Sequence, residues 1–339
     1  MKVNHRGQTR VVPFIPSAAS KRHVGLRFAA GAAIFLVLIM ATVLGVDSQY
    51  VFFAGYVVLQ GIVLATGWNI LGGYAGYINF GGAGYFAVGA YTSAALYQTL
   101  GLPLPVLIAA GAAVGALLGL ATGAISLRLK GIYFSIATLA VAGILETVVT
   151  NWNFIGGARG LALMTPQPPP PFNTYNQWLF FVMAVMVVAA ISIARYIERS
   201  WIGRGLRALR DDEMASECAG VPTLKLKVFA ACVSGAVMAA AGTPFALYMS
   251  FIEPNSAFSL NYALSAIAMP IIGGTSYWIG PVIGAVLLGM AQQIMSVKLP
   301  GEWSVLIMGT VLMVFVIAAP NGVVGLVATL RTKRNRGDK

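Results

Sequence analysis

Charged residues are scarce in this chain of 339 residues, and so are cysteine and histidine. Only 9% of the residues are charged and 58% are hydrophobic, whereas about a quarter of the residues of an average soluble protein are charged. The composition therefore predicts an integral membrane protein. Two cysteines, Cys218 and Cys232, allow neither a disulfide framework nor a cysteine metal site. Both histidines, His5 and His23, lie in a basic N-terminal stretch, which excludes histidine-based catalysis inside the membrane.

Motifs for chemistry are lacking as well. The sequence contains no phosphate-binding loop, no cluster of metal ligands and no nucleophile beside a base. We therefore expect no cofactor, no metal, no ATP hydrolysis and no covalent catalysis by the chain itself. The net charge of +12 raises the alternative of nucleic-acid binding, but the basic residues cluster at the two tails and in one central polar segment. No aromatic pattern for stacking on RNA accompanies them, so the expected partner of these charges is the lipid bilayer.

Ten apolar runs predict ten membrane-spanning helices. The runs are 28–46, 50–71, 77–97, 106–127, 132–150, 178–196, 228–251, 259–272, 283–297 and 303–327. The first run follows a basic stretch, as the apolar part of a signal peptide does. That stretch is too long for a signal peptide, however, and the end of the run is a poor cleavage site. We therefore expect an uncleaved first span and an all-α polytopic fold.

The distribution of basic residues predicts the orientation. With ten spans, both termini and the central polar segment lie on the cytoplasmic side, and only Arg159 and Lys298 of the 22 basic residues face outward. The predicted organisation is a basic tail at 1–27, a transmembrane domain at 28–330 with a cytoplasmic loop at 198–227 and an external proline-rich loop at 151–177, and a second basic tail at 331–339.

The central polar segment, Glu198 to Lys227, carries eleven of the 32 charged residues. Asp211 or Asp212 is suited to cap the start of a helix, and Glu213 is favourable in its first turn. Gly220 and then Pro222 supply a stop, which gives a helix of about two turns. Such a short helix is marginal in isolation, so we expect it to dock against something.

This short helix carries an apolar stripe. Met214 and Cys218 are four residues apart, as are Ala215 and Ala219, while Glu213 and Glu217 make an adjacent acidic stripe. One interpretation is a docking element for a soluble partner. The alternative is an ordinary positively charged loop on the cytoplasmic side with a helical kink in it.

The stretch from Gly67 to Tyr91 contains eight glycines in 25 residues. Glycines at this density have two interpretations. Small residues allow close helix packing, which we favour for Gly84 to Gly89. The second interpretation is irregular backbone that lines a polar cavity. We favour it for 72–82 because Asn69, Asn79 and tyrosines accompany the glycines.

Several segments resemble one family of membrane proteins. The pattern G-R-x-x-x-A-L-R-x-D-E-x-A-x-x-x-G is matched by Gly203, Arg204, Ala208, Leu209, Arg210, Asp212, Glu213, Ala215 and, one residue late, Gly220. A second pattern, N-x-x-x-G-x-x-G leading to F-x-x-G-A-Y, is matched by Asn69, Gly73, Gly76, Phe86, Gly89, Ala90 and Tyr91. The segments RLKGIYFSIATLA, GGARGL, IIGGTSYWIGPVIGA and APNGVVGL extend the match over about residues 50 to 326. The chain thereby resembles the permease subunits of the branched-chain amino acid ABC importers.

The resemblance implies a fold, partners and site residues. The fold would be that of type II importer permeases, with two inverted halves of five spans each; the sequence alone shows no convincing repeat. The partners would be a second homologous permease subunit, two ATP-binding cassette ATPase subunits and a periplasmic substrate-binding protein, at a bacterial inner membrane. The residues that couple to the ATPase would be Arg204, Arg207, Arg210, Asp211, Asp212, Glu213, Met214, Ala215, Glu217 and Gly220.

The predicted translocation pathway contains Asn69, Gly72, Gly73, Tyr74, Gly76, Asn79, Thr138 and Glu146. Glu146 is the only acid well inside a predicted span, and a carboxylate in the membrane is usually functional. We expect Glu146 to contact the ammonium group of the substrate or to shape the exit; the alternatives are hydration and pairing with Arg159. The family more often has an acid one turn earlier, where this chain has Gly143.

Import of branched-chain amino acids is the function that the resemblance implies, and related permeases also carry urea or short amides. An ion-coupled secondary transporter is a second class. It would normally need intramembrane ionisable groups, and Glu146, the only acid well inside a predicted span, is thin support for it. A membrane-embedded enzyme would need paired polar catalytic groups at the bilayer surface, and the sequence shows none.

Overall fold

The computed structural model describes residues 18–46, 48–126, 129, 131–298, 309–310, 313 and 322–325. Two compact units divide the chain, Met1–Val46 and Asp47–Lys339. The first contains helix α1 (Ala18–Gly45), which begins ten residues earlier than the predicted span and is apolar enough to cross a membrane over Gly25–Gly45. The predicted span at 303–327 lies almost entirely outside the described residues, and the tail at 331–339 lies wholly outside them.

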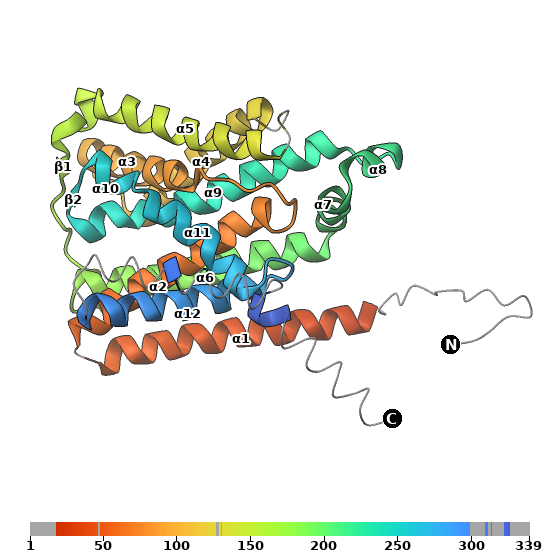
Figure 1. The fold of residues 1–339 in the computed structure, drawn as a ribbon. Helices are drawn as coiled ribbons and strands as arrows, with labels where there is room; N and C mark the ends of the chain where they lie inside the picture. Colours follow the sequence, from red (N-terminus) through yellow and green to blue (C-terminus); the bar gives the residue numbers. More distant parts are fainter. Residues whose placement is uncertain are drawn as a thin grey trace, which may run out of the picture. The chain divides into compact units, whose positions relative to one another are not determined.

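The second unit is built from long helices that lie side by side (Figure 1). They are α2 (Gln49–Gly72), α3 (Gly82–Leu100), α4 (Leu104–Ser126), α5 (Ile132–Thr150), α6 (Tyr175–Arg199), α9 (Thr223–Met249), α11 (Leu260–Gly273) and α12 (Ile279–Lys298). With α1 included, seven helices in the described part of the chain are long and apolar enough to cross a membrane. The chain is thus an all-α, multi-pass membrane protein, and the total of ten spans stays a prediction.

Helix α9 forms the centre of the second unit and packs against α2, α3 and α4. Small residues let the backbones touch. A Cβ atom added at Gly89 of α3 would lie 1.9 Å from the carbonyl oxygen of Ala239, and one at Gly242 would lie 1.9 Å from that of Phe86. Larger residues at these two positions are excluded, as expected where glycines mediate helix packing. Close packing was the interpretation favoured for Gly84 to Gly89, and the structure confirms it for Gly89.

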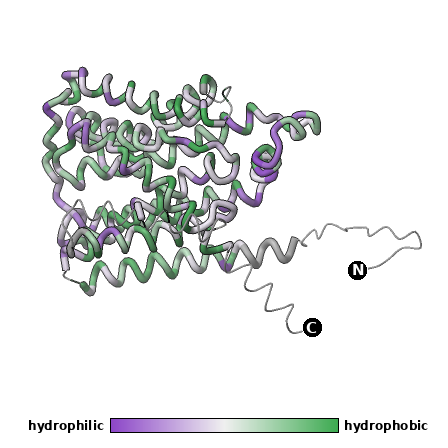
Figure 2. Tube along the Cα trace, in the orientation of Figure 1, coloured by the Kyte–Doolittle hydropathy of each residue, from purple (hydrophilic) through white to green (hydrophobic). Residues whose placement is uncertain are grey.

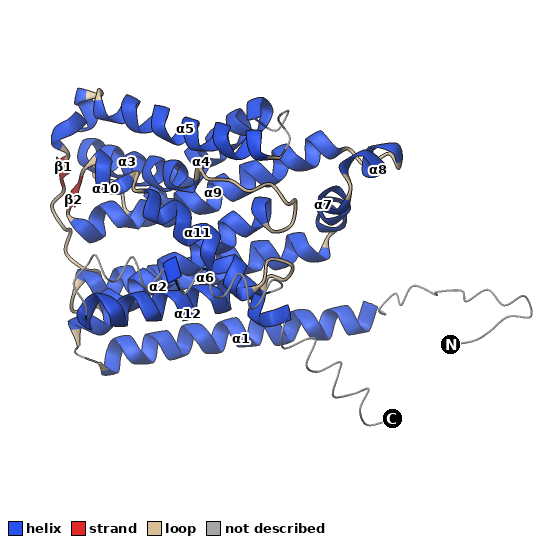
Figure 3. Ribbon diagram, in the orientation of Figure 1, coloured by secondary structure: helices blue, strands red, loops and turns tan. Residues whose placement is uncertain are grey.

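Short elements occupy one end of the second unit (Figure 3). The loop after α5 contains two 3-10 turns, η1 (Asn153–Ile155) and η2 (Gly157–Arg159), and strand β1 (Leu161–Ala162). Strand β1 pairs antiparallel with β2 (Phe251–Ile252), and α10 (Pro254–Ala257) follows. The pairing ties the predicted external loop to the end of α9, a connection that the sequence analysis did not anticipate.

Two further helices, α7 (Trp201–Asp211) and α8 (Glu213–Cys218), connect α6 with α9. The predicted span at 77–97 starts too early: α3 begins only at Gly82, because the preceding residues leave the helical conformation and make hydrogen bonds with side chains instead. We call residues Gly73–Gly81 the connector.

Candidate functional site

Polar groups gather at the end of the second unit that lies opposite β1 and β2. We call this region the junction. It comprises the connector, residues 198–227 and the turn Gly274–Trp278 between α11 and α12. Residues 198–227 include the end of α6, α7, α8 and the start of α9. Figure 2 shows hydrophilic residues concentrated on α7, whereas the long helices are largely hydrophobic. The junction contains all of the predicted coupling residues and four of the eight predicted pathway residues, Gly73, Tyr74, Gly76 and Asn79.

Helix α8 starts and stops where the sequence predicts. The Asp212 side chain accepts a hydrogen bond from the backbone N–H of Ala215 at 3.0 Å, so Asp212 is the N-cap. Asp211, the other candidate, is instead the last residue of α7. Gly220 has a φ of +82°, the left-handed conformation that commonly ends helices. The outcome is a six-residue helix with a defined orientation.

The apolar stripe of α8 faces solvent. Met214 is 69% exposed, and Ala215, Cys218 and Ala219 are exposed as well. Only Ser216 of this helix is buried. Exposed methionines are common at protein interaction surfaces because their flexible side chains adapt to a partner. The exposed Met214 therefore suits a docking element.

Helix α7 was missed by the sequence analysis. Its arginines, Arg204, Arg207 and Arg210, make the segment read as a polar loop. Two signals were nevertheless present. Ser200 caps the helix by accepting a hydrogen bond from the N–H of Gly203 at 3.3 Å, and Leu206 and Leu209, three residues apart, are both buried.

The connector is irregular backbone that is largely buried. Tyr74 and Asn79 are 2% and 1% exposed. Hydrogen bonds from side chains satisfy its backbone: Trp68 Nε1 donates to the carbonyl of Asn79 at 2.7 Å, and Ser135 Oγ donates to that of Ile78 at 2.8 Å. The glycine-rich stretch therefore breaks the helix, as expected for 72–82, and side chains of α2 and α5 satisfy the carbonyls of Asn79 and Ile78.

Helix α5 holds the far end of the connector. Thr138 Oγ1 accepts a hydrogen bond from the N–H of Phe80 at 3.1 Å, which places this predicted pathway residue beside the connector. Glu146 lies eight residues further along α5, about 12 Å away by helical rise, and is not part of the same cluster. Among the described residues, no ion pair joins Glu146 to Arg159.

Arg210 connects α7 with the connector. Its Nη1 atom donates a hydrogen bond to the carbonyl of Gly73 at 2.8 Å. Gly76 has a φ of +78°, and a Cβ atom added there would lie 2.6 Å from Cγ of Arg210. Glycine at position 76 therefore serves two purposes: it permits a left-handed backbone and leaves room for the arginine.

Glu213 connects α8 with both α9 and the connector. Its Oε1 atom pairs with Nζ of Lys227 at 2.5 Å, and its Oε2 atom accepts a hydrogen bond from the Tyr77 hydroxyl at 2.7 Å. Lys227 is only 3% exposed, and its Nζ atom lies 4.7 Å from the centre of the Tyr77 ring. Burial and the adjacent carboxylate of Glu213 raise the pKa of Tyr77, so the tyrosine stays protonated and donates.

Glu198, at the end of α6, makes the third set of contacts. Its Oε2 atom accepts hydrogen bonds from the backbone N–H of Trp278 at 2.7 Å and from the Tyr74 hydroxyl at 3.5 Å. Burial and then Glu198 raise the pKa of Tyr74. Asn69 Nδ2 donates to the carbonyl of Thr275 at 3.2 Å. The turn Gly274–Trp278 is thereby joined to α6 and to the end of α2.

Sequence reasoning did not single out Glu198, Lys227, Tyr77 or Trp278 as site residues. Each contacts a partner between 14 and 136 residues away along the chain, and no local pattern reports such contacts. One signal was available: Lys227 is a basic residue at the edge of an apolar run, a position in which a buried charge needs a partner.

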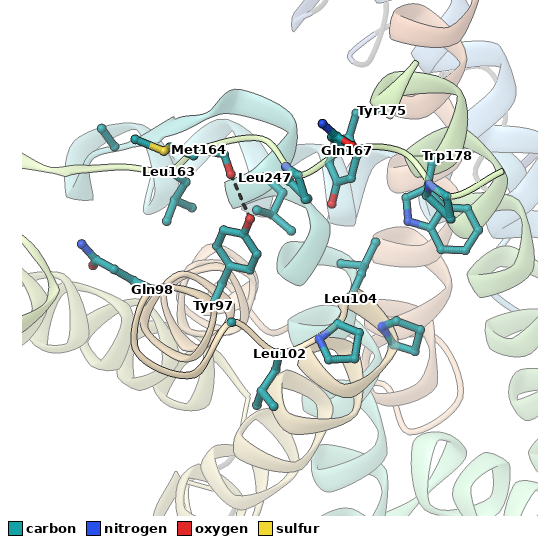
Figure 4. Close-up of a pocket in the computed structure, with 16 residues that line it drawn as sticks. Tyr97, Gln98, Leu102, Leu104, Leu163, Met164, Gln167, Tyr175, Trp178 and Leu247 are labelled. Carbon is teal, nitrogen blue, oxygen red and sulfur yellow. Dashed lines mark hydrogen bonds between the residues drawn. The ribbon is translucent and has the colours of Figure 1, made fainter. Parts of the chain in front are cut away.

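A pocket of about 800 Å³ lies at the opposite end of the second unit (Figure 4). It is bounded by the end of α3, the turn to α4, residues Ala162 to Pro169 of the long loop, the start of α6 and Leu247 of α9. The Tyr97 hydroxyl donates to the carbonyl of Met164 across its rim at 3.1 Å. Leucines, prolines and Trp178 make the lining mainly apolar. None of the predicted site residues lies here.

Apolar helices that enclose irregular, hydrogen-bonded backbone are found in membrane transport proteins. Residues 49–316 match the model of the family described as branched-chain amino acid transport system, permease component. The chain therefore belongs to this family.

Curated relatives agree with this assignment. The high-affinity branched-chain amino acid transport system permease protein LivM of Salmonella typhimurium is 29% identical over 294 residues, which cover 77% of this chain and 67% of LivM. LivM of Escherichia coli is 28% identical over the same coverage, and LivH of Escherichia coli is 23% identical over 78% of this chain and 90% of LivH. No solved structure matches the chain. The chain is thus a permease, and the relatives are permeases rather than enzymes.

Proposed function

We propose that the chain is the permease subunit of an ATP-driven importer for branched-chain aliphatic amino acids in the bacterial inner membrane. The relatives LivM and LivH are permeases of high-affinity branched-chain amino acid transport systems. In this proposal a periplasmic binding protein delivers the amino acid. A second, homologous permease subunit completes the pathway, and two ATPase subunits supply the energy.

The observation that carries the proposal is the arrangement of the junction. A capped short helix, α8, exposes Met214 while the first residue of the same helix, Glu213, is hydrogen-bonded to the connector. Helix α8 thus carries the proposed docking surface on one side and contacts the buried connector on the other. The proposed coupling surface consists of Arg204, Arg207, Arg210, Asp211, Asp212, Glu213, Met214, Ala215, Glu217 and Gly220.

The proposed pathway uses the connector and its neighbours, with Glu146 further along α5. Asn69, Gly72, Gly73, Tyr74, Gly76, Asn79 and Thr138 line or fix the connector, and Glu146 contacts the ammonium group of the substrate or shapes the exit. The walls around them are apolar, which suits an aliphatic side chain. Replacing Glu146 by Gln removes the charge at constant size; unchanged uptake in that variant would remove Glu146 from the pathway.

Reconstitution tests the proposal directly. The full chain is assembled with the partner permease, the two ATPases and the binding protein of its own gene neighbourhood in proteoliposomes. We expect uptake of radiolabelled leucine that requires both ATP and the binding protein. Uptake that persists without the ATPases under an ion gradient would instead indicate a secondary transporter. Uptake of urea but not leucine would place the chain with the urea and amide permeases.

A further inference from the structure

The first residue of α8 is attached to two other elements by one carboxylate. Glu213 uses Oε1 for Lys227, in the first turns of α9, and Oε2 for Tyr77, in the connector. The exposed side of the same helix carries Met214 and Cys218. The Glu213 side chain is therefore a direct link from α8 to the connector, beside the link that Arg210 of α7 makes to Gly73.

The attachment is one that α8 cannot easily release. Lys227 is 3% exposed, and a buried ammonium group without a carboxylate partner is strongly unfavourable. The Tyr77 hydroxyl donates to an ionised oxygen, the stronger kind of hydrogen bond, and the ring of Tyr77 lies 4.7 Å from the same ammonium group. If α8 moved alone, both contacts would be lost at once. Movement of α8 together with the connector and the start of α9 keeps them.

Neighbouring contacts hold the connector at both ends. Thr138 and Ser135 of α5 hold its far end by hydrogen bonds to Phe80 and Ile78. Arg210 of α7 holds its start at the carbonyl of Gly73. Tyr77 lies between these two sets of contacts and reaches the docking helix.

We propose that Tyr77, Glu213 and Lys227 are positioning residues that transmit displacement of α8 to the connector. The connector holds the buried residues Tyr74 and Asn79, so its displacement alters the proposed pathway. The inference rests on the proposed function, because it requires an ATPase that moves α8. The inference adds to the proposed function three residues that link ATP hydrolysis to movement of the substrate.

The central variant is Tyr77→Phe, which removes one hydroxyl and leaves the salt bridge between Glu213 and Lys227. In the reconstituted complex, both ATP hydrolysis and leucine uptake are measured per assembled complex. We expect uptake to fall about tenfold, the scale of one hydrogen bond to a charged group, while the ATPase rate changes less than about twofold. The number of ATP molecules consumed per leucine therefore rises. The matched control is Tyr50→Phe, a half-exposed tyrosine at the start of α2, which leaves the ratio unchanged.

A double variant tests the salt bridge between Glu213 and Lys227 without leaving an unpaired buried charge. Glu213→Gln with Lys227→Met replaces both charged groups at similar volume, and we expect the same rise in ATP consumed per leucine. If both variants lose uptake and ATPase activity in proportion, or keep the wild-type ratio, the residues do not transmit motion and the inference fails. Absence of ATP-driven uptake in the wild-type complex would instead contradict the proposed function.

Discussion

At the scale of single residues, the junction depends on positions where only one residue type fits. Gly76 combines a φ of +78° with an approach of 2.6 Å to the Arg210 side chain. Gly101, at the end of α3, has a similar φ of +58°, but a Cβ atom there would meet nothing within 4 Å. Comparing substitutions at Gly76 and Gly101 therefore separates the effect of backbone strain, present at both positions, from that of side-chain crowding, present only at Gly76.

We expect Gly76→Ala to destabilise the protein more than Gly101→Ala. Each substitution forces a left-handed backbone on alanine, at a cost of about 1–2 kcal/mol. Only the first also displaces Arg210 from the carbonyl of Gly73. The midpoints of thermal unfolding of the two purified variants in one detergent provide the comparison. Equal losses at both positions would contradict the close contact between Gly76 and Arg210.

Glu198 gives a second prediction at this scale. Glu198→Gln replaces an ionised acceptor by a neutral one opposite Trp278 N–H and Tyr74 OH, so we expect a loss of about 1–2 kcal/mol in the free energy of unfolding. The control is Glu253→Gln, an exposed carboxylate at the opposite end, for which we expect a change within about 0.5 kcal/mol. Denaturant unfolding of both variants measures the difference; similar stabilities would mean that Glu198 does not hold the turn Gly274–Trp278.

At the scale of elements, the sequence predicts what local patterns encode. The Asp212 cap, the Gly220 stop and the break in the glycine-rich stretch each depend on neighbouring residues, and the structure shows all three. Helix α7 escaped prediction because its arginines conceal the short apolar repeat of Leu206 and Leu209. Partners across elements, such as Glu213 with Lys227 and Tyr77, depend on packing of distant segments, which one sequence does not reveal.

Helix α8 is predicted to be the surface that the ATPase recognises. We expect Met214→Glu to reduce recovery of the ATPase subunits with the purified permease by about tenfold or more, because a charge enters an apolar contact. The matched control, Met164→Glu, changes a methionine that is 88% exposed at the opposite end of the second unit. Copurification of the ATPase subunits with each variant measures the effect. Full recovery with Met214→Glu would show that the ATPase docks elsewhere.

At the scale of the whole molecule, apolar surface remains exposed on α5, at Ile136, Leu139 and Ile144 among others. Helices of a membrane protein expose such residues to lipid or to another subunit. The sequence predicted the membrane class and most span centres, because apolar runs are local and long. It did not predict how the spans pack, since that depends on backbone contacts such as those of Gly89 and Gly242 with their partners.

Orientation is the property on which the proposed function depends. The predicted topology places α8 on the cytoplasmic side, where ATP is available, and α8 carries the exposed Cys218. The other cysteine, Cys232, lies half-buried within α9 and is removed by Cys232→Ser, so that Cys218 becomes the single thiol of the chain.

Labelling of Cys218 with a membrane-impermeant maleimide, in vesicles of both orientations, tests the central claim most directly. The account predicts rapid labelling of Cys218 in inside-out vesicles and none in intact right-side-out vesicles until a detergent opens them. Labelling of Cys218 in intact right-side-out vesicles would place α8 on the outer face, and no ATPase in the cytoplasm could then act on the junction.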